Sequence, residues 1–282
     1  MSLLAAGIAA AAFASPLSPR AVSAQDPAQA GDLSQHGVIR TVVLDPGHGG
    51  ADEGVHGLNG TKEKDLVLAF ARRLKAEIES KLQIHVLLTR EGDDSVPIDS
   101  RAVYANTSKA DLFISLHANA SVRQTLRGTE VMYLSTEDIA PTLSGGKTTR
   151  PAVTKPPETV PLVNGGTRLI QPVPWDVAQL PYVEQSAIFS ATLVKHLTDR
   201  AIPGNMPLQA TAPLRALVGA NMPAVLVELG FLTNPDDEAA LNGPDAPAAI
   251  IAAIVDTIAD VKFGFPAPGG GATRTGGGTA QK

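Results

Sequence analysis

Four side chains that could bind a metal ion or move a proton stand beside apolar segments of the sequence. His48 lies in the glycine-rich run DPGHGG, directly after IRTVVL, and His117 follows LFISL. Glu228 follows AVLV, and Glu63 opens a segment with helical periodicity. Two histidines and a glutamate are a sufficient ligand set for catalytic zinc, which keeps three protein ligands and leaves a fourth position open. If these side chains converge in space, their types indicate a zinc site.

Each of these residues, taken alone, has a simpler interpretation. His48 would be a hydrogen-bonded turn residue, and His117 a core histidine with satisfied nitrogens. Glu63 would interact with a helix dipole, which is worth about 0.3 to 1 kcal/mol, and Glu228 would reach solvent at a strand end. Against this, Glu63 shares the apolar helix face of Leu66, and an ionised Glu228 would be costly to bury without a partner. Only convergence of the four favours the functional interpretation.

The elements that must position these residues alternate between short apolar segments and longer amphipathic ones. This alternation predicts an α/β domain with a mainly parallel sheet, and such sheets bind ligands beyond the carboxyl ends of their strands. The predicted strands are Ile39–Leu44, Ile84–Thr89, Leu112–Leu116, Glu130–Leu134 and Ala224–Val227. The predicted helices are Glu63–Lys81, Ile98–Lys109, Val183–Arg200 and Pro247–Val261, the first with Thr61 available as its N-cap.

The two ends of the chain differ from its middle. Residues 3–13 form an apolar run of eleven, too short to span a bilayer and typical of a signal peptide, although no basic residue precedes it. An alanine-rich N-terminal helix is the alternative. We expect a signal peptide over residues 1–24, a linker over 25–37, one folded domain over 38–265 and a flexible Gly/Thr-rich tail over 266–282.

A proline-rich insert over residues 135–181 interrupts the alternation of strands and helices. Loops of this length are usually functional or disordered. Glu137, Asp138 and Glu158 lie in it and could approach a metal, although solvated loop charges are far more common.

Composition excludes several kinds of chemistry. The chain has no cysteine, so disulfides, thiolate metal sites and thiol nucleophiles are absent, and any metal needs His, Asp or Glu ligands. The net charge of −5 and the lack of a basic block argue against a nucleic-acid partner. Because 44% of the residues are apolar and 18% charged, most of the chain is expected to fold.

Five stretches of the sequence resemble the zinc-dependent N-acetylmuramoyl-L-alanine amidases of the Amidase_3 family. Their order and spacing agree with that family over most of residues 38–261. The stretches are LDPGHGG (44–50), TKEKDL (61–66), ADLFISLHAN (110–119), GTEVMYLS (128–135) and MPAVLVELGFLTN (222–234).

The resemblance implies roles for the four residues introduced above. It makes His48, Glu63 and His117 the zinc ligands and Glu228 the catalytic carboxylate. It also implies a single α/β domain with a central, mostly parallel sheet of about six strands flanked by helices. The sixth strand would be Leu214–Val218.

The same resemblance implies a peptidoglycan hydrolase that cleaves the amide bond between N-acetylmuramic acid and L-alanine. The partners would be the glycan strand and its stem peptide, with a protein activator as a further candidate and no stable membrane span. The enzyme would be exported, to the periplasm or beyond the cell. Two other functions stay open at this point: a catalytically silent wall-binding module, and a zinc peptidase acting on the stem peptide.

Several other polar residues receive more modest expectations. Asp45 could orient His48, or it could cap a turn. Arg101 and Asn106 fit the family pattern and are expected to serve packing and capping. Some relatives carry an inhibitory helix in place of the insert, but this insert is too proline-rich for one long helix, and we expect it to shield the site. Surface or strand positions are expected for His56, His85 and His196.

Overall fold

The computed structural model describes residues 38–143, 158–161, 167–170, 174–202 and 208–265. The expected signal peptide, linker and C-terminal tail lie outside these residues, as do parts of the insert.

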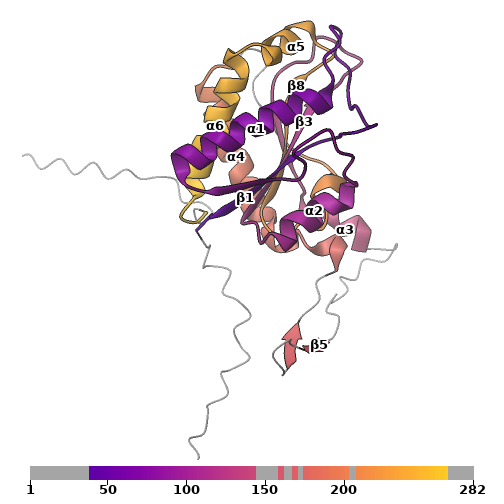
Figure 1. The fold of residues 1–282 in the computed structure, drawn as a ribbon, viewed down its shortest axis with the longest axis vertical. Helices are drawn as coiled ribbons and strands as arrows, with labels where there is room; N and C mark the ends of the chain where they lie inside the picture. The colour runs from indigo at the N-terminus through magenta and orange to yellow at the C-terminus, as the bar shows by residue number, and fades with distance from the viewer. Residues whose placement is uncertain (1–37, 144–157, 162–166, 171–173, 203–207, 266–282) are drawn as a thin grey trace, which may run out of the picture. The chain divides into compact units, whose positions relative to one another are not determined.

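A six-stranded sheet forms the centre of the domain (Figure 1). Its order is β2-β1-β3-β8-β4-β7, in which β4 runs antiparallel to β8 and all other neighbours are parallel. The expected single α/β domain with a mostly parallel sheet of six strands is therefore confirmed. The strands are β1 (Thr41–Pro46), β2 (His85–Leu88), β3 (Leu112–Asn119), β4 (Glu130–Tyr133), β7 (Leu208–Thr211) and β8 (Ala224–Phe231).

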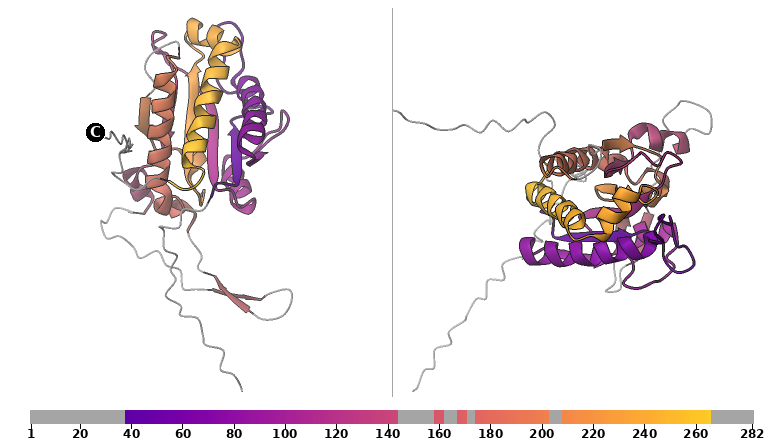
Figure 2. Two further views of the ribbon diagram at one scale, coloured as in Figure 1. Left: turned by 90° about the vertical axis from the view of Figure 1, so that its left-hand side faces the viewer. Right: turned by 90° about the horizontal axis from the view of Figure 1, so that it is seen from above.

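Helices cover both faces of this sheet. The larger core lies under four helices, of which α1, α4 and α6 run side by side across one face (Figure 2). These four are α1 (Glu63–Leu82), α4 (Val183–Asp199), α5 (Pro235–Asn242) and α6 (Asp245–Val261). The smaller core involves α2 (Ile98–Thr107), α3 (Thr136–Leu143) and the 3-10 turns η1 (Trp175–Val177) and η3 (Arg215–Leu217).

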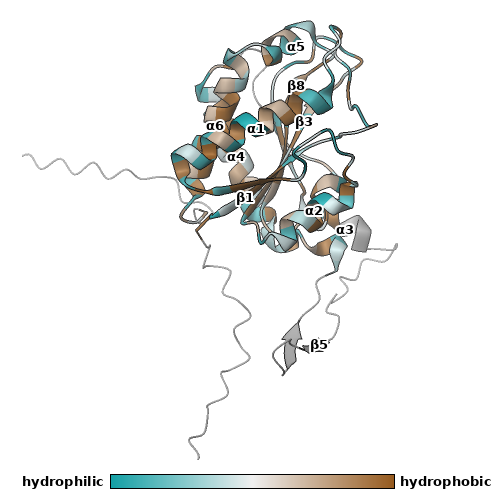
Figure 3. Cartoon of the chain, viewed as in Figure 1, coloured by the Kyte–Doolittle hydropathy of each residue, from teal (hydrophilic) through white to brown (hydrophobic). Residues whose placement is uncertain are grey.

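The alternation of side chains along the strands assigns the polar residues to the face of the smaller core. Successive residues of a strand point to opposite faces. In β1, Val42 and Leu44 pack in the larger core, whereas Val43 packs in the smaller one and Asp45 follows on that same face. The central strands are mainly hydrophobic in Figure 3. On the face of the smaller core, the side chains of the central strands are therefore apolar at first and become polar or ionisable toward the carboxyl ends of the strands.

Strands β3 and β8 are longer than the sequence predicts. His117 and Glu228 were expected to follow their strands, but both lie within them, as Cα partners in the parallel ladder. The pairing continues because both strands are central and each satisfies the backbone groups of the other. The two side chains therefore lie next to each other on one face of the sheet.

The prediction of the sixth strand at Leu214–Val218 is wrong. That segment contains η3, and its apolar pattern reflects the burial of Ala216 and Leu217 in the smaller core. The sixth strand is β7, whose residues are largely exposed at the sheet edge beside β4. An exposed edge strand carries no apolar run, so its sequence gives no such signal.

Two helix starts also differ from expectation. The N-cap of α1 is Lys62, not Thr61, and it makes no side-chain capping bond. Helix α5 was not predicted, although Asn234 caps it by accepting from the backbone N–H groups of Asp236 and Asp237.

The described part of the insert contains only short elements. They are α3, the antiparallel hairpin of β5 (Glu158–Pro161) and β6 (Thr167–Ile170), η1 and η2 (Leu180–Tyr182). Residues 144–157, 162–166 and 171–173 lie outside the description, so shielding of the site by the insert stays a prediction. Among the described helices, none combines the length and apolar character needed to cross a bilayer.

Candidate metal centre

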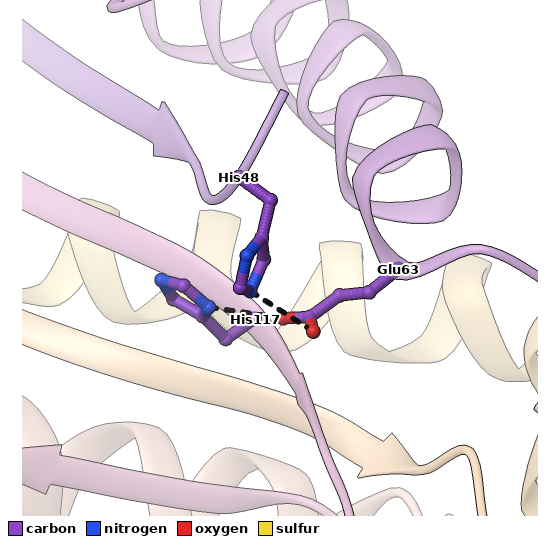
Figure 4. A group of neighbouring side chains, drawn as sticks. All are labelled: His48, Glu63 and His117. Carbon is purple, nitrogen blue, oxygen red and sulfur yellow. Dashed lines mark hydrogen bonds and ion pairs between the residues drawn. The ribbon is translucent and has the colours of Figure 1, made fainter. Parts of the chain in front are cut away.

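Three of the four candidate side chains meet near the carboxyl ends of β1 and β3 (Figure 4). His48 comes from the loop after β1, His117 from β3 and Glu63 from the first residue of α1. His48 Nε2 lies 3.0 Å from Glu63 Oε2, and His117 Nδ1 lies 2.9 Å from Glu63 Oε1. One donor atom from each residue falls within 4.8 Å of the other two.

The loop after β1 holds His48 in a backbone conformation that residues other than glycine rarely adopt. His48 has a φ of 60°, in the left-handed region, and Gly49 and Gly50 follow with φ of 122° and 62°. A left-handed conformation costs a residue other than glycine roughly 1 to 2 kcal/mol. The surrounding structure must therefore stabilise this loop, and such outliers concentrate at functional sites.

Two buried arginines supply that stabilisation. Arg101 donates to the carbonyl oxygens of Pro46 (2.9 Å) and His48 (2.8 Å), and Arg90 donates to those of Pro46 (2.9 Å) and Gly47 (2.8 Å). Asp45, which is fully buried, accepts from Arg101 at 2.7 Å. The guanidinium groups thus hold three consecutive carbonyls of the loop that presents His48.

Two glycines leave room for the side chains of the cluster. A Cβ atom on Gly47 would lie 2.2 Å from His117 Cε1, which is closer than real Cβ contacts come. A Cβ on Gly54, whose φ is +68°, would lie 2.5 Å from Glu63 Oε2 and 2.7 Å from His48 Cδ2. Glycine at both positions is a steric requirement of the three-residue cluster.

The Glu63 carboxylate is buried at the centre of the cluster. Besides the two imidazoles, it accepts hydrogen bonds from the backbone N–H groups of Val55 (2.8 Å) and Ala118 (3.0 Å). Burial alone would raise the pKa of Glu63, but the hydrogen bonds from His117 and His48 hold it well below the usual range. Glu63 is therefore an anion at neutral pH, as a metal-binding carboxylate must be.

The second nitrogen of His48 faces Asp52, not Asp45. Its Nδ1 lies 2.9 Å from Asp52 Oδ2, whereas Asp45 bonds to Thr89, Arg101 and Ser115. The suggestion that Asp45 orients His48 is therefore wrong. The hydrogen bond with Glu63, helped by Asp52, raises the pKa of His48 despite the opposing effect of burial.

Glu228 lies beside the cluster on the neighbouring strand β8. It is the Cα partner of His117 on one side and of Glu130 on the other. Burial raises the pKa of Glu228 to about 7, and the negative charges of Glu63 and Glu130 act in the same direction. Its Oε2 is buried and has no hydrogen-bond partner within the described protein. A carboxyl group in this state suits proton transfer near neutral pH.

The donor set fits Zn²⁺. At ligand distances of about 2.0 to 2.2 Å, tetrahedral angles place ligand atoms about 3.3 to 3.6 Å apart. The contacts of Glu63 with the two histidines, 3.0 Å through Oε2 and 2.9 Å through Oε1, are somewhat shorter than this spacing, and one ligand atom from each of the three residues lies within 4.8 Å of the others. Metal ions and protons compete for such groups, so a divalent cation bound here would displace protons from the two imidazoles. The unpartnered oxygen of Glu228 adds an acceptor beside this set.

The remaining sequence candidates lie outside this cluster. Asn106 bonds to Gly219 O and to the Asn221 N–H and so fixes the turn before β8. Asp138 accepts from Ser135, and Glu137 is exposed on the same helix, so neither belongs to the described cluster. His56 and His196 pair with other acids, and His85 is exposed on β2.

Sequence reasoning missed three contributors. Asp52 stands four residues after His48, just beyond the glycine-rich run, and Arg90 is the second residue after β2, so their positions near strand ends were the available signal. Glu130 lies in a recognised stretch, but only the antiparallel pairing of β4 with β8 reveals that it faces Glu228.

Comparisons with known proteins identify the family of this chain. The family model Amidase_3, described as N-acetylmuramoyl-L-alanine amidase, matches residues 42–260. AmiA of Escherichia coli is 32% identical over 226 residues, which cover 78% of this chain and 75% of AmiA. AmiC of Escherichia coli is 31% identical over 202 residues, covering 70% of this chain but only 46% of AmiC.

Solved structures share the fold. The N-acetylmuramoyl-L-alanine amidase of Clostridium difficile superposes with a TM-score of 0.59 at 24% identity, over 79% of this chain and 96% of that one. Ami1 of Mycobacterium smegmatis gives a TM-score of 0.58 at 23% identity, over 79% and 97%. Because the family model matches most of this chain, the chain belongs to the Amidase_3 family of N-acetylmuramoyl-L-alanine amidases.

Proposed function

We propose that the chain is a zinc-dependent hydrolase that cleaves the amide bond between N-acetylmuramic acid and the L-alanine of a peptidoglycan stem peptide. The observation that carries this proposal is the convergence of His48, Glu63 and His117, with Glu228 on the adjacent strand. Membership of the amidase family supplies the substrate class.

In this proposal His48, Glu63 and His117 hold the metal. Zn²⁺ bound there would supply Lewis-acid polarisation of the amide carbonyl and activation of a water nucleophile. The two imidazoles bind as neutral bases, and Glu63 contributes the negative charge. Asp52, whose Oδ2 lies 2.9 Å from His48 Nδ1, would orient the His48 ring, as carboxylates commonly do for metal-binding histidines.

Glu228 is the proposed proton carrier. It accepts a proton from the attacking water while the water oxygen bonds to the carbonyl carbon. It then returns that proton to the alanine nitrogen as the C–N bond breaks, so that the glycan carries a carboxylic acid and the peptide a free amine. A pKa of about 7 suits both halves of this cycle, because neither protonation state is strongly favoured at neutral pH.

The substrate class also supports a location. Peptidoglycan lies outside the cytoplasmic membrane, so we propose that the enzyme is exported to the periplasm or secreted. Its partners would be the glycan strand and the stem peptide, with a protein activator as a further hypothesis.

Digestion of purified sacculi tests the proposed reaction. With zinc present, mass spectrometry should detect intact stem peptides that begin with a free L-alanine. A chelator should abolish this release, and added Zn²⁺ should restore it. Peptides shortened at an internal bond would instead identify a peptidase, and the absence of any product from the zinc-loaded protein would identify a silent module.

A further inference from the structure

The loop that leads into α1 positions the Glu63 carboxylate. Glu63 is the first residue of α1 and reaches the cluster from there (Figure 4). Val55 holds it through two hydrogen bonds: the Glu63 N–H donates to Val55 O at 2.9 Å, and the Val55 N–H donates to Glu63 Oε2 at 2.8 Å. Because both ends of the loop over residues 56–62 meet at Glu63, the position of this carboxylate depends on the shape of the loop.

The start of α1 does not hold this loop through a side-chain cap. Its N-cap residue, Lys62, makes no side-chain capping bond, although such a bond commonly stabilises a helix start. Within the loop, the Gly57 N–H donates to Thr61 O at 2.8 Å, and the Gly60 N–H donates to Gly57 O at 3.1 Å. These bonds close the loop but do not use the N–H groups of Asn59 and Thr61.

A buried carboxylate from α5 binds those two N–H groups. Glu238 accepts from the Asn59 N–H at 2.8 and 3.0 Å through its two oxygens, and from the Thr61 N–H at 3.2 Å. The Asn59 side chain also donates to it at 3.1 Å, and Asn242 of α5 donates to Thr61 Oγ1 at 2.9 Å. A Cβ atom on Gly57 would lie 2.1 Å from Glu238 Oε1, so the loop and the carboxylate are in close contact.

Glu238 is ionised at neutral pH. Burial alone would raise its pKa, but the hydrogen bonds from Thr61 and Asn59 hold the pKa below its usual range. Hydrogen bonds to an ionised acceptor are roughly twice as strong as those between neutral groups. The element that precedes α5 is β8, so the segment that carries Glu228 also anchors the loop of Glu63.

We propose that Glu238 is a positioning residue, which holds the N–H groups of Asn59 and Thr61 and thereby keeps the Glu63 carboxylate in the orientation that binds the metal. Glu238 lies outside the cluster and acts only through the loop. The proposal rests on the proposed metal site and is independent of the identity of the substrate.

Zinc affinity tests this role against a matched variant on the same helix. Asp237 is also buried and accepts two backbone N–H groups, those of Gly128 and Phe231, which lie outside the loop. In competition with a colorimetric chelator, Glu238→Gln should weaken zinc binding about tenfold, because the amide offers one acceptor oxygen instead of two. Asp237→Asn should leave zinc affinity unchanged. An unchanged affinity in Glu238→Gln, or an equal loss in both variants, would overturn the proposal.

A variant in the loop alters the same contact from the other side. Gly57→Ala should push the Glu238 carboxylate away from the loop, because the added Cβ would overlap Oε1. Gly57 is only partly buried, so this variant tests the contact even if Glu238→Gln fails to fold. Both variants should weaken zinc binding to a similar degree, and the double variant should bind no more weakly than the more affected single one. Additive losses would show separate effects and would contradict the proposal.

Amide hydrogen exchange in the chelator-treated protein tests the link without any metal. The informative group is the Val55 N–H, which bonds to Glu63 and not to Glu238. In Glu238→Gln its exchange, followed by NMR, should become about tenfold faster because the loop opens more often. The amides of β1 should exchange as before. Faster exchange confined to Asn59 and Thr61 would show a purely local contact and would rule out the positioning role.

These two readouts separate the role of Glu238 from the proposed function. If the unmodified chain binds no zinc but the exchange of Val55 responds as expected, the metal site fails and the link from Glu238 to Glu63 stands. If zinc binds to the cluster, and neither its affinity nor the exchange of Val55 responds to Glu238→Gln, the metal site stands and the positioning role fails.

Discussion

At the scale of single residues, each member of the site is placed in an environment that prepares its charge state. Glu63 is kept ionised by two imidazoles and two backbone N–H groups, although burial opposes this. Glu228 lies on the strand next to that of His117, and its pKa is raised because the carboxyl group is buried and its Oε2 has no hydrogen-bond partner in the described protein. Two carboxylates of the same type thus have their pKa values separated, which is a pattern typical of divided roles in catalysis.

Replacement of Glu228 should separate metal binding from chemistry. Glu228→Gln keeps the size of the side chain but cannot accept a proton, so hydrolysis of muropeptides should fall by at least about 100-fold. Zinc content, measured by atomic absorption, should stay unchanged because the variant leaves His48, Glu63 and His117 intact. Glu91→Gln, at an exposed glutamate outside the cluster, is the control, with turnover expected within a few-fold of the original. Retained turnover in Glu228→Gln would remove this residue from its role.

The raised pKa of Glu228 also predicts how stability depends on pH in the chelator-treated protein. Between about pH 5 and 7 the folded state holds a proton that the unfolded state, with a pKa near 4.5, has lost. The free energy of unfolding should therefore fall as pH rises, by up to about 1.4 kcal/mol per pH unit from this group.

The titration of His48 also lowers the free energy of unfolding as pH rises. Its folded pKa is raised above 6.5, so its stabilisation is complete below that value and is lost as pH rises through the folded pKa. Urea unfolding at several pH values should show that the free energy of unfolding changes less steeply with pH in Glu228→Gln. The change that remains would come from His48. An identical slope for both proteins would contradict the assigned state of Glu228.

At the scale of elements, the site depends on how the loop after β1 is held between β2 and α2. Arg90 follows β2 and Arg101 lies on α2, and their guanidinium groups donate to the carbonyls of Pro46, Gly47 and His48. The strand supplies the position of this loop, but the arginines fix its left-handed conformation. Both are nearly fully buried, so their charges matter to folding as well as to the site.

The pair of Arg101 and Asp45 should be strongly coupled. Arg101→Met leaves a buried carboxylate without its cation and should lower the free energy of unfolding by about 3 to 5 kcal/mol. Adding Asp45→Asn should restore much of that loss, because the unpaired charge is then gone. Urea unfolding of the two single variants and the double variant measures the coupling. Additive losses would show that the two side chains act independently.

At the scale of the whole molecule, the sequence predicts what depends on apolar patterning and on strand ends. Buried strands such as β1 and β3 are visible as apolar runs, and the polar groups at their ends identify His48 and His117. The edge strand β7 is not visible because its residues are exposed, and the apolar run at Leu214–Val218 misleads because burial alone produces it.

The contacts of individual polar side chains escape prediction for another reason. That Asp52 faces His48 while Asp45 faces Arg101 depends on the path of a glycine-rich loop, which hydrophobic periodicity does not encode. The row formed by His117, Glu228 and Glu130 depends on strand order and register. Both are properties of the assembled sheet.

The central claim is that His48, Glu63 and His117 bind one zinc ion. A crystal of the zinc-loaded chain, measured with X-rays on both sides of the zinc absorption edge, tests it most directly. We expect one anomalous peak about 2.0 to 2.2 Å from His48 Nε2, His117 Nδ1 and a Glu63 carboxylate oxygen. A peak bound by other residues, or no peak in a protein that turns over substrate, would contradict the account.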